Sequence, residues 1–219
     1  VRVRETALVP VPDDMPPEQA CLLACPIGVA LQGAQDVAGV TSEDVVMVTG
    51  AGGGLGVHAI QIAKALGART LALTSSEGKM SSLLELGADE AVPAMELDFS
   101  EIILAMTGER GANVIVDTVG SPLFASSVRS LAQFGRMVLL GEVAGGNTQI
   151  NLAEILFRDA KIMGSMGAQR RHVEQALEMV KNGRIRPLVH ATLPLKDVLI
   201  SLGWMNERKL FGRVVQLPP

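Results

Sequence analysis

The sequence predicts an α/β fold in which helices cover both faces of one doubly wound, six-stranded parallel sheet. Short apolar runs rich in β-branched residues alternate with longer runs of helical periodicity, which is typical of βαβ units. Five glycines fall among residues 50–56, where the first strand-like run meets the first helix-like run. The composition, with 48% hydrophobic and 19% charged residues over 219 positions, indicates a globular protein with ample apolar content for a core.

The predicted strands and helices follow one another in strict order. The first strand-like run, residues 45–48, is short, apolar and β-branched, as expected of a buried parallel strand. The helix-like run 55–66 places its apolar residues near one face, and Gly67 ends it. The later strand-like runs are residues 70–74, 90–93, 113–117, 136–141 and 161–165. The helix-like runs between them are residues 77–86, 97–106, 122–131 and 151–158. This order predicts a Rossmann-type domain over residues 26–165.

The two flanks, residues 1–25 and 166–219, do not continue this alternation. The first flank contains four prolines and one short strand-like run. The second flank contains a predicted helix at 170–182, a strand-like run at 189–195, a helix from Leu195 and a closing strand at 212–217. We therefore expect the flanks to form a unit separate from the sheet.

Charge and hydropathy argue against several partners. A net charge of −4 does not suit a nucleic-acid partner bound through phosphate neutralisation. We find no apolar run near the roughly 20 residues that a membrane helix needs, and no targeting segment. Two cysteines, Cys21 and Cys25, do not indicate a disulfide framework. We expect a cytoplasmic protein with a small-molecule substrate and with neither a nucleic-acid nor a membrane partner.

The glycine cluster is typical of a phosphate-binding loop between a strand and a helix. The first N–H groups of a helix are unpaired and partly positive, and glycine lets a pyrophosphate come close. Ala51, Gly53 and Gly56 give A-x-G-x-x-G rather than the strict G-x-G-x-x-G. The stretch also fits the T-G-x-x-x-G-x-G pattern of short-chain dehydrogenases, but their essential tyrosine has no counterpart in a chain without tyrosine. A tight turn without a ligand is the alternative interpretation.

The end of the second predicted strand bears on the choice between NAD and NADP. An NAD site often has a carboxylate there, about 20 residues after the glycines, to bind the ribose hydroxyls. This chain instead has Thr74, Ser75 and Ser76, with Lys79 one turn further on. Hydroxyl groups and a lysine favour a 2′-phosphate, so NADP is expected and NAD remains possible. The alternative is that Ser75 or Ser76 only caps a helix.

Seven segments together resemble the medium-chain dehydrogenase/reductase superfamily, especially its quinone-oxidoreductase and acryloyl-CoA-reductase-like branches. In family order they are "ACPIGVALQGA", "VMVTGAGGGLGVHAIQIAKALGA", "LLELGADEAV", "VIVDTVG", "GRMVLLGE", "KIMGSMGAQRR" and "FGRVVQL". The resemblance implies an NADP-dependent oxidoreductase acting on a carbonyl or an activated alkene, such as a quinone, enone or enoyl thioester. It also implies that residues 1–25 and 166–219 are the remainder of a barrel-like catalytic domain. Such a piece is expected to be inactive alone.

The resemblance further implies where the coenzyme would be bound. The residues expected at the pyrophosphate are Gly53, Gly54, Leu55 and Gly56, and those at the adenosine phosphate are Ser75 and Lys79, beside Thr74. The residues expected along the rest of the groove, toward the nicotinamide, are Thr118, Val119, Gly141, Glu142, Gly164, Ser165 and Met166. Val29 stands where the family often has a threonine beside the nicotinamide. No catalytic residue is predicted in this chain.

Metal binding is not expected. In zinc-dependent members a cysteine just before the coenzyme domain is one zinc ligand, and Cys25 is at a matching place. A catalytic zinc takes three protein ligands, and we expect Cys21 and Cys25 to be part of a small apolar core helix instead. The three histidines, His58, His172 and His190, are scattered, and His172 is expected to open a surface helix.

Two further expectations concern assembly and activity. The edge strand at residues 161–165 and the nearby apolar residues Ile155, Leu156, Phe157, Ile162 and Met163 predict a homodimer, because an exposed strand edge favours pairing. The alternative to an enzyme is a nucleotide-binding module without turnover of its own.

Overall fold

The computed structural model describes residues 2–94 and 98–219. Six strands within these residues form the predicted parallel sheet. In the order β3-β2-β1-β4-β5-β6, the strands are Glu90–Pro93, Arg69–Thr74, Val45–Val48, Ala112–Asp117, Leu131–Leu139 and Lys161–Gly164. Every neighbouring pair is parallel. The fold class predicted from the sequence is confirmed, and the strand order reverses between β1 and β4.

Alternate residues of the central strands supply two separate cores. Val46 and Val48 of β1 belong to one buried cluster, whereas Met47 belongs to the other, because successive side chains of a strand point to opposite faces. The first cluster contains residues of α3 (Gly56–Ala65), α4 (Met80–Glu85) and α8 (Arg170–Lys181). The second contains residues of α5 (Ser100–Met106) and α6 (Phe124–Arg129). The sheet is thus covered on both faces, as the sequence predicts.

A helical run, Pro17–Val37, precedes the sheet and contains α1 (Pro17–Ala20) and α2 (Val29–Leu31). It is kinked at Cys25 (φ −130°, ψ 109°), because a residue before proline is pushed out of the helical region. With 21 residues and a mean hydropathy of 1.3, it is long and apolar enough to cross a membrane by length and composition alone. The expectation that no apolar run approaches this length is therefore wrong. Of its apolar 18-residue window, 56% is buried inside the molecule, which is typical of a core helix.

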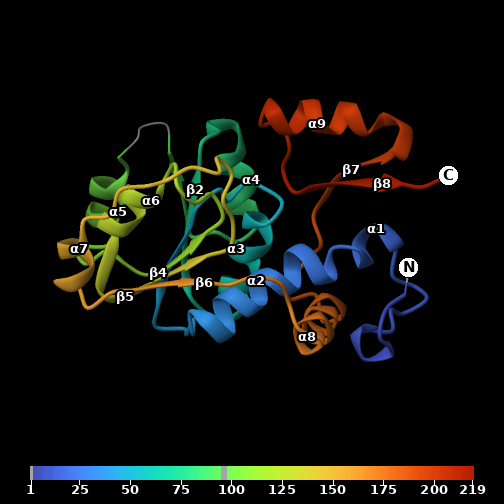
Figure 1. Cartoon of the computed structure of the whole chain (residues 1–219), viewed down its shortest axis with the longest axis horizontal. Coiled ribbons are helices and arrows are strands. Elements are labelled where there is room, and N and C mark those ends of the chain that lie inside the picture. The colour runs from blue at the N-terminus through green and yellow to red at the C-terminus, as the bar shows by residue number, and fades with distance from the viewer. Residues whose placement is uncertain (1, 95–97) are drawn as a thin grey trace.

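The C-terminal residues form a small unit beside the sheet (Figure 1). Strands β7 (Val189–Pro194) and β8 (Arg213–Leu217) pair in parallel, and α9 (Val198–Asn206) connects them. These two strands form a sheet of their own, whereas α8 of the same flank packs on the central sheet. The strand-like run expected within residues 1–25 is not a strand over the described part, residues 2–25, where Glu5–Ala7 form a short helical turn.

Several element boundaries differ from those predicted. β5 begins at Leu131 rather than at residue 136, and it includes Phe134 in a left-handed conformation (φ 59°) where its register with β4 shifts. The predicted helix 77–86 begins as a tight turn, Glu77–Lys79, before α4. The helix predicted from Leu97 is observed from Ser100, and Leu97 itself lies outside the described residues.

Candidate functional site

The glycine loop, residues 49–55, joins the end of β1 to the start of α3. Gly50 has a φ of 59°, a conformation that favours glycine, and a Cβ on Gly56 would collide with the Gly50 backbone. The Gly53 N–H donates a hydrogen bond to the Gly50 carbonyl (2.9 Å). These glycines let α3 begin close against β1. The partly positive N-terminus of the ten-residue helix is therefore behind the loop.

A hydrogen-bond network joins the loops that follow β1 and β4. The Thr49 hydroxyl donates to Oδ1 of the buried Asp117 (2.5 Å), and the Thr118 hydroxyl donates to the Thr49 carbonyl (2.7 Å). The same Asp117 oxygen accepts from the N–H groups of Val119 (2.9 Å) and Gly120 (3.1 Å). Burial raises the pKa of Asp117. The network fixes both loops at the reversal of the strand order, where α/β sheets bind their ligands.

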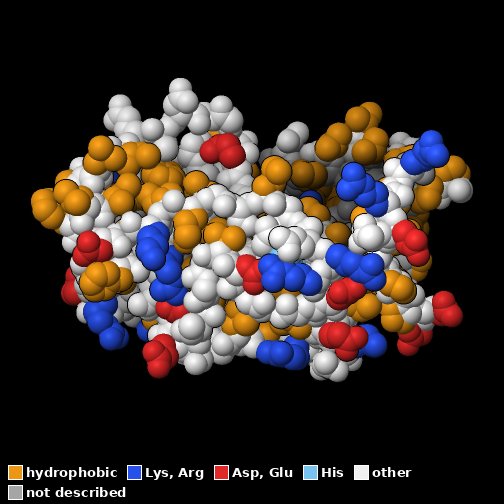
Figure 2. Space-filling view, turned by 60° about the horizontal axis from the view of Figure 1, so that its bottom comes forward, with side chains coloured by type: hydrophobic (Ala, Val, Ile, Leu, Met, Phe, Trp, Pro, Cys, Tyr) orange, Lys and Arg blue, Asp and Glu red, His pale blue; other side chains and the backbone are white. Residues whose placement is uncertain are grey.

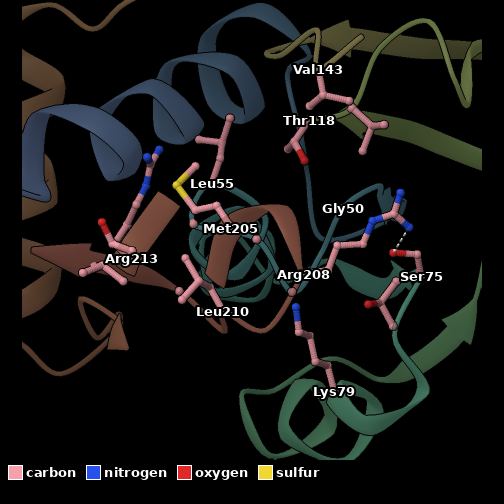
Figure 3. A pocket seen from close by; sticks show the side chains of 18 of the residues that line it. Gly50, Leu55, Ser75, Lys79, Thr118, Val143, Met205, Arg208, Leu210 and Arg213 are labelled. Carbon is pink, nitrogen blue, oxygen red and sulfur yellow. Dashed lines mark hydrogen bonds between the residues drawn. The ribbon is translucent and has the colours of Figure 1, made fainter. Parts of the chain in front are cut away.

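A cavity of about 440 Å³ lies over these two loops and under the C-terminal unit. The side chains of most lining residues are drawn in Figure 3. The described residues that line the cavity include three with a positive charge, Lys79, Arg208 and Arg213, and no aspartate or glutamate. A cavity of this size with converging cationic groups suits a small anionic ligand.

One group of polar residues lies at the β2 end of the cavity. Arg208 donates a hydrogen bond to the Ser75 hydroxyl (3.4 Å), as Figure 3 shows, and Lys79 lines the same cavity. Burial and, second, the positive charge of Arg208 lower the pKa of Lys79. Two like charges this close repel each other, so an anion between them would relieve an unfavourable interaction.

A second cationic group lies at the glycine loop. The Arg213 side chain packs on Gly54 so closely that a Cβ on Gly54 would collide with it. The Arg213 Nε is buried and has no hydrogen-bond partner. A buried, unpaired donor at the N-terminal end of a helix favours an anionic ligand. The cavity therefore offers two anionic positions, one at Gly54 and one at Ser75.

Arg208 and Arg213, which come from the C-terminal flank, were not predicted from the sequence as site residues. Arg208 is 133 positions from the serine that it contacts. The only local signal was the basic character of "NERKLFGRVV", and nothing in that segment indicates what it contacts.

The structure brings eight of the fourteen predicted site residues into the cavity wall. They are Gly53, Gly54, Leu55, Thr74, Ser75, Lys79, Thr118 and Val119. A ninth, Gly56, is the first residue of α3 behind the loop. The remaining five, which do not line this cavity, are Gly141, Glu142, Gly164, Ser165 and Met166. Their predicted roles at the nicotinamide stay predictions.

Glu142 organises two loops. Its carboxylate accepts hydrogen bonds from the N–H (2.7 Å) and hydroxyl (2.8 Å) of Ser121 and from the N–H groups of Ala144 (2.9 Å) and Gly145 (3.0 Å). These bonds, those from Ser121 first, lower the pKa of Glu142 to about 2. The side chain is thus an ionised carboxylate that connects the loops after β4 and β5.

The two cysteines do not belong to the core. The segment buries Leu22 and Leu23, but both Cys21 and Cys25 are exposed, so the core interpretation of these thiols is wrong. Within residues 2–94 and 98–219, no three His, Cys, Asp or Glu side chains converge as metal ligands. The described donors therefore do not fit a zinc site.

Two of the three histidines, His58 and His172, are buried and hydrogen-bonded to other segments of the chain. His172, expected to open a surface helix, is 1% exposed. Its Nδ1 accepts a hydrogen bond from the Gln169 N–H (3.0 Å) in the cap of α8, and its Nε2 is hydrogen-bonded to Asp36 (2.6 Å). His58 is equally buried, at 1% exposure, in the first turn of α3. It contacts the glycine loop and the C-terminal flank, a role that the sequence did not indicate.

The chain is similar in sequence and in fold to known dehydrogenases and reductases. Residues 54–182 match the family described as zinc-binding dehydrogenase. The chain is 33% identical over 218 residues to the acryloyl-coenzyme A reductase of Sulfurisphaera tokodaii, covering 99% of this chain and 64% of that protein. It is 28% identical over 222 residues to a quinone oxidoreductase-like protein 2 homolog of Nematostella vectensis, covering 96% and 60%. The crystal structure of an NAD-dependent alcohol dehydrogenase superposes with a TM-score of 0.91 at 33% identity, covering 98% and 62%. The chain thus spans less than two thirds of the length of these relatives.

Proposed function

The chain belongs to the zinc-binding dehydrogenase family, and from that premise we propose that it is the coenzyme-binding part of an NADP-dependent oxidoreductase. The observation that carries the proposal is the cavity between the glycine loop and the C-terminal unit, with three cationic and no acidic residues in its described wall. The coenzyme would supply or accept the hydride, and the protein would orient it.

The pyrophosphate is proposed to lie between the glycine loop and Arg213. The N-terminal N–H groups of the loop and helix α3 would donate hydrogen bonds to it. The Arg213 guanidinium, which lines the cavity, would give a charge-assisted hydrogen bond from the opposite side. No carboxylate in the described wall opposes the negative charge of the ligand.

The preference for NADP over NAD is proposed from the residues at the end of β2. Ser75, Lys79 and Arg208 would bind the 2′-phosphate of the adenosine, and a carboxylate suited to bare ribose hydroxyls is not among the residues of this wall. The structural neighbour named above is an NAD-dependent enzyme, so the proposed preference for NADP rests on the residues of this chain and not on that neighbour.

The nicotinamide is proposed to extend past Thr118 and Val119, which line the cavity at the end of β4. Carbonyls and activated alkenes, such as quinones, enones or enoyl thioesters, are the proposed acceptors. The names of the two similar proteins, a reductase of acryloyl-coenzyme A and a quinone oxidoreductase-like protein, support this class.

The polypeptide of residues 1–219 is proposed to bind the coenzyme without appreciable turnover. Hydride transfer needs a substrate positioned close to the nicotinamide in a site that excludes water. Val29, Gly141 and Gly164, the residues predicted near the nicotinamide, have no side-chain proton to donate.

Fluorescence tests the proposal, because the chain contains one tryptophan, Trp204, and no tyrosine. Trp204 is on α9 next to Met205, which lines the cavity. Titration with NADPH should produce saturable energy transfer from the indole to the reduced nicotinamide. In the same samples, NADPH oxidation with quinones, enones and acyl-CoA alkenes should stay far below about 1 per second, an ordinary enzymatic rate. No saturable binding would contradict the proposed function, and fast turnover would contradict the proposed inactivity.

A further inference from the structure

Two buried polar side chains of α3 bind the backbone of the C-terminal flank. His58 and Gln61 are one turn apart, and they are 1% and 6% exposed. The Gln61 amide donates to the Arg186 carbonyl (3.0 Å), and the Arg186 N–H donates to the Gln61 amide oxygen (2.7 Å). The Gln61 amide thus makes two reciprocal hydrogen bonds with the Arg186 backbone, as a neighbouring strand would. These bonds hold the C-terminal flank against α3 just before β7 begins.

His58 adds a second link, which includes the glycine loop. The Leu188 N–H donates to His58 Nε2 (3.0 Å), so this nitrogen carries no proton. The proton is therefore on Nδ1, which donates to the Gly54 carbonyl (2.9 Å). Burial, above all, lowers the pKa of His58 to about 4, so the neutral ring that makes both bonds is the form present near neutral pH.

The Leu188 backbone is hydrogen-bonded to Arg213 as well as to His58. The Arg213 N–H donates to the Leu188 carbonyl (2.9 Å), next to the pairing of Val189 with Arg213 in the β7–β8 ladder. The Arg213 side chain then returns to Gly54, on which it packs. Gly54, His58, Leu188 and Arg213 therefore form a closed ring of contacts that joins the glycine loop to the C-terminal unit.

We propose that His58 is a positioning residue that holds Arg213 against the glycine loop, so that a diphosphate ligand meets loop and arginine as one preformed site. This inference rests on the proposed function. A preformed donor loses less conformational freedom on binding than one on an independently moving segment, and so contributes more to affinity. The Arg213 guanidinium, which packs on Gly54 and lines the cavity, is the group that such an arrangement would serve.

Two isosteric substitutions separate the two bonds of the ring. In His58→Asn, the amide nitrogen can replace Nδ1 and keep the bond to Gly54, whereas the acceptor for Leu188 is lost. In His58→Gln, the amide reaches the place of Nε2 and can keep the bond to Leu188. His58→Asn should weaken the binding of ADP-ribose about tenfold, the equivalent of one hydrogen bond, and His58→Gln less than about threefold.

Repeating the His58 substitution in a variant without Arg213 distinguishes an effect on the position of Arg213 from a general loss of stability. In an Arg213→Met background, His58→Asn should change the ADP-ribose affinity less than about twofold, because the group that it positions is gone. Adenosine 2′-monophosphate, which has no diphosphate, should bind the wild type and His58→Asn equally. The control is Lys181→Ala, at an exposed position on α8 outside this ring of contacts.

Each outcome decides the inference. Equal effects of His58→Asn with and without Arg213 would overturn it, as would equal weakening of the adenosine 2′-monophosphate. If His58→Asn does not fold, amide hydrogen exchange of the wild type gives the answer: ADP-ribose should slow exchange at Leu188, Arg213 and Gly54 together, and unchanged exchange at Leu188 would overturn the inference. A wild type that binds neither ADP-ribose nor NADPH would refute the proposed function, and the inference with it.

Discussion

Arg208 donates a hydrogen bond of 3.4 Å to the hydroxyl of Ser75, and this contact connects the loop after α9 to the end of β2. The C-terminal unit therefore forms one wall of the cavity, and Lys79 lines the same cavity. The arrangement gives the proposed 2′-phosphate three polar partners from two distant parts of the chain.

Lys79→Ala should weaken NADPH binding about tenfold or more and NADH binding less than about twofold. The ammonium would contact only the 2′-phosphate, and a hydrogen bond to a charged group contributes about 1.5–3 kcal/mol. Trp204 energy transfer with both coenzymes measures the difference. The control is Lys181→Ala, an exposed lysine on α8. Equal losses for the two coenzymes would show that Lys79 does not select NADP.

Gly53→Val should abolish coenzyme binding with little loss of stability. A Cβ on Gly53 meets only the Gly50 carbonyl oxygen, at 3.2 Å, so the fold can accommodate it with a small shift. The rest of the valine side chain would occupy the space of the pyrophosphate, since Gly53 lines the cavity. Thermal unfolding and an NADPH titration of the same sample test both parts. Normal binding by the folded variant would rule out the phosphate role of the loop.

The stability of the protein should depend on pH through His58. Burial and the charge of Arg213 lower its folded-state pKa to about 4 from 6.5, against the opposing bond to the Gly54 carbonyl. The unfolded chain therefore binds the proton more readily. The contribution of the neutral ring is complete above pH 6.5 and is lost as the pH falls toward 4, by about 3 kcal/mol in all.

Urea unfolding of the wild type and of His58→Gln at several pH values measures this contribution. The difference between the two proteins should shrink from pH 7 to pH 4.5, because the variant has no proton to bind at this position. Leu199→Ala, which changes an exposed side chain that does not titrate, should keep the pH dependence of the wild type. A pH-independent difference would mean that His58 titrates normally in the folded state.

The central sheet could be predicted from the sequence because its signals are local. Val46, Met47 and Val48 are buried on alternating sides of the sheet, and the glycine cluster begins two residues later. Strand, loop and helix can therefore each be predicted from residues that are adjacent in the sequence. The contacts of Arg208, Arg213 and His58 could not be predicted, because they depend on how a distant flank packs. The exposure of Cys21 and Cys25 was missed because the kink before Pro26 changes which residues of the helix face inward.

A homodimer through the edge of the sheet remains a prediction. β6 is an edge strand of the sheet, and α7 (Leu152–Leu156) precedes it. The side chains of Leu156, the last residue of α7, and of Phe157, which follows it, are 68% and 77% exposed. Hydrophobic side chains gather at this end of the molecule in Figure 2. Phe157→Glu should convert the dimer into a monomer, because it would bury a charge in the interface. Light scattering at micromolar concentration measures the mass.

The control for the dimer is Leu199→Glu, at an equally exposed apolar position (76%) on α9, away from the sheet edge. This variant should stay dimeric. A monomeric wild type would contradict the prediction, and a monomeric Leu199→Glu with a dimeric Phe157→Glu would move the interface to α9.

The most direct test of the account is to map where NADP binds by the amide chemical shifts of the isotope-labelled chain. We predict saturable shifts at Gly53, Gly54, Ser75 and Arg213, because these line the cavity between the glycine loop and the C-terminal unit. A second cavity, lined by Phe124, Arg129 and residues 149–151, is the natural comparison. Shifts confined to that second cavity, or no shifts at all, would contradict the assignment of the coenzyme site.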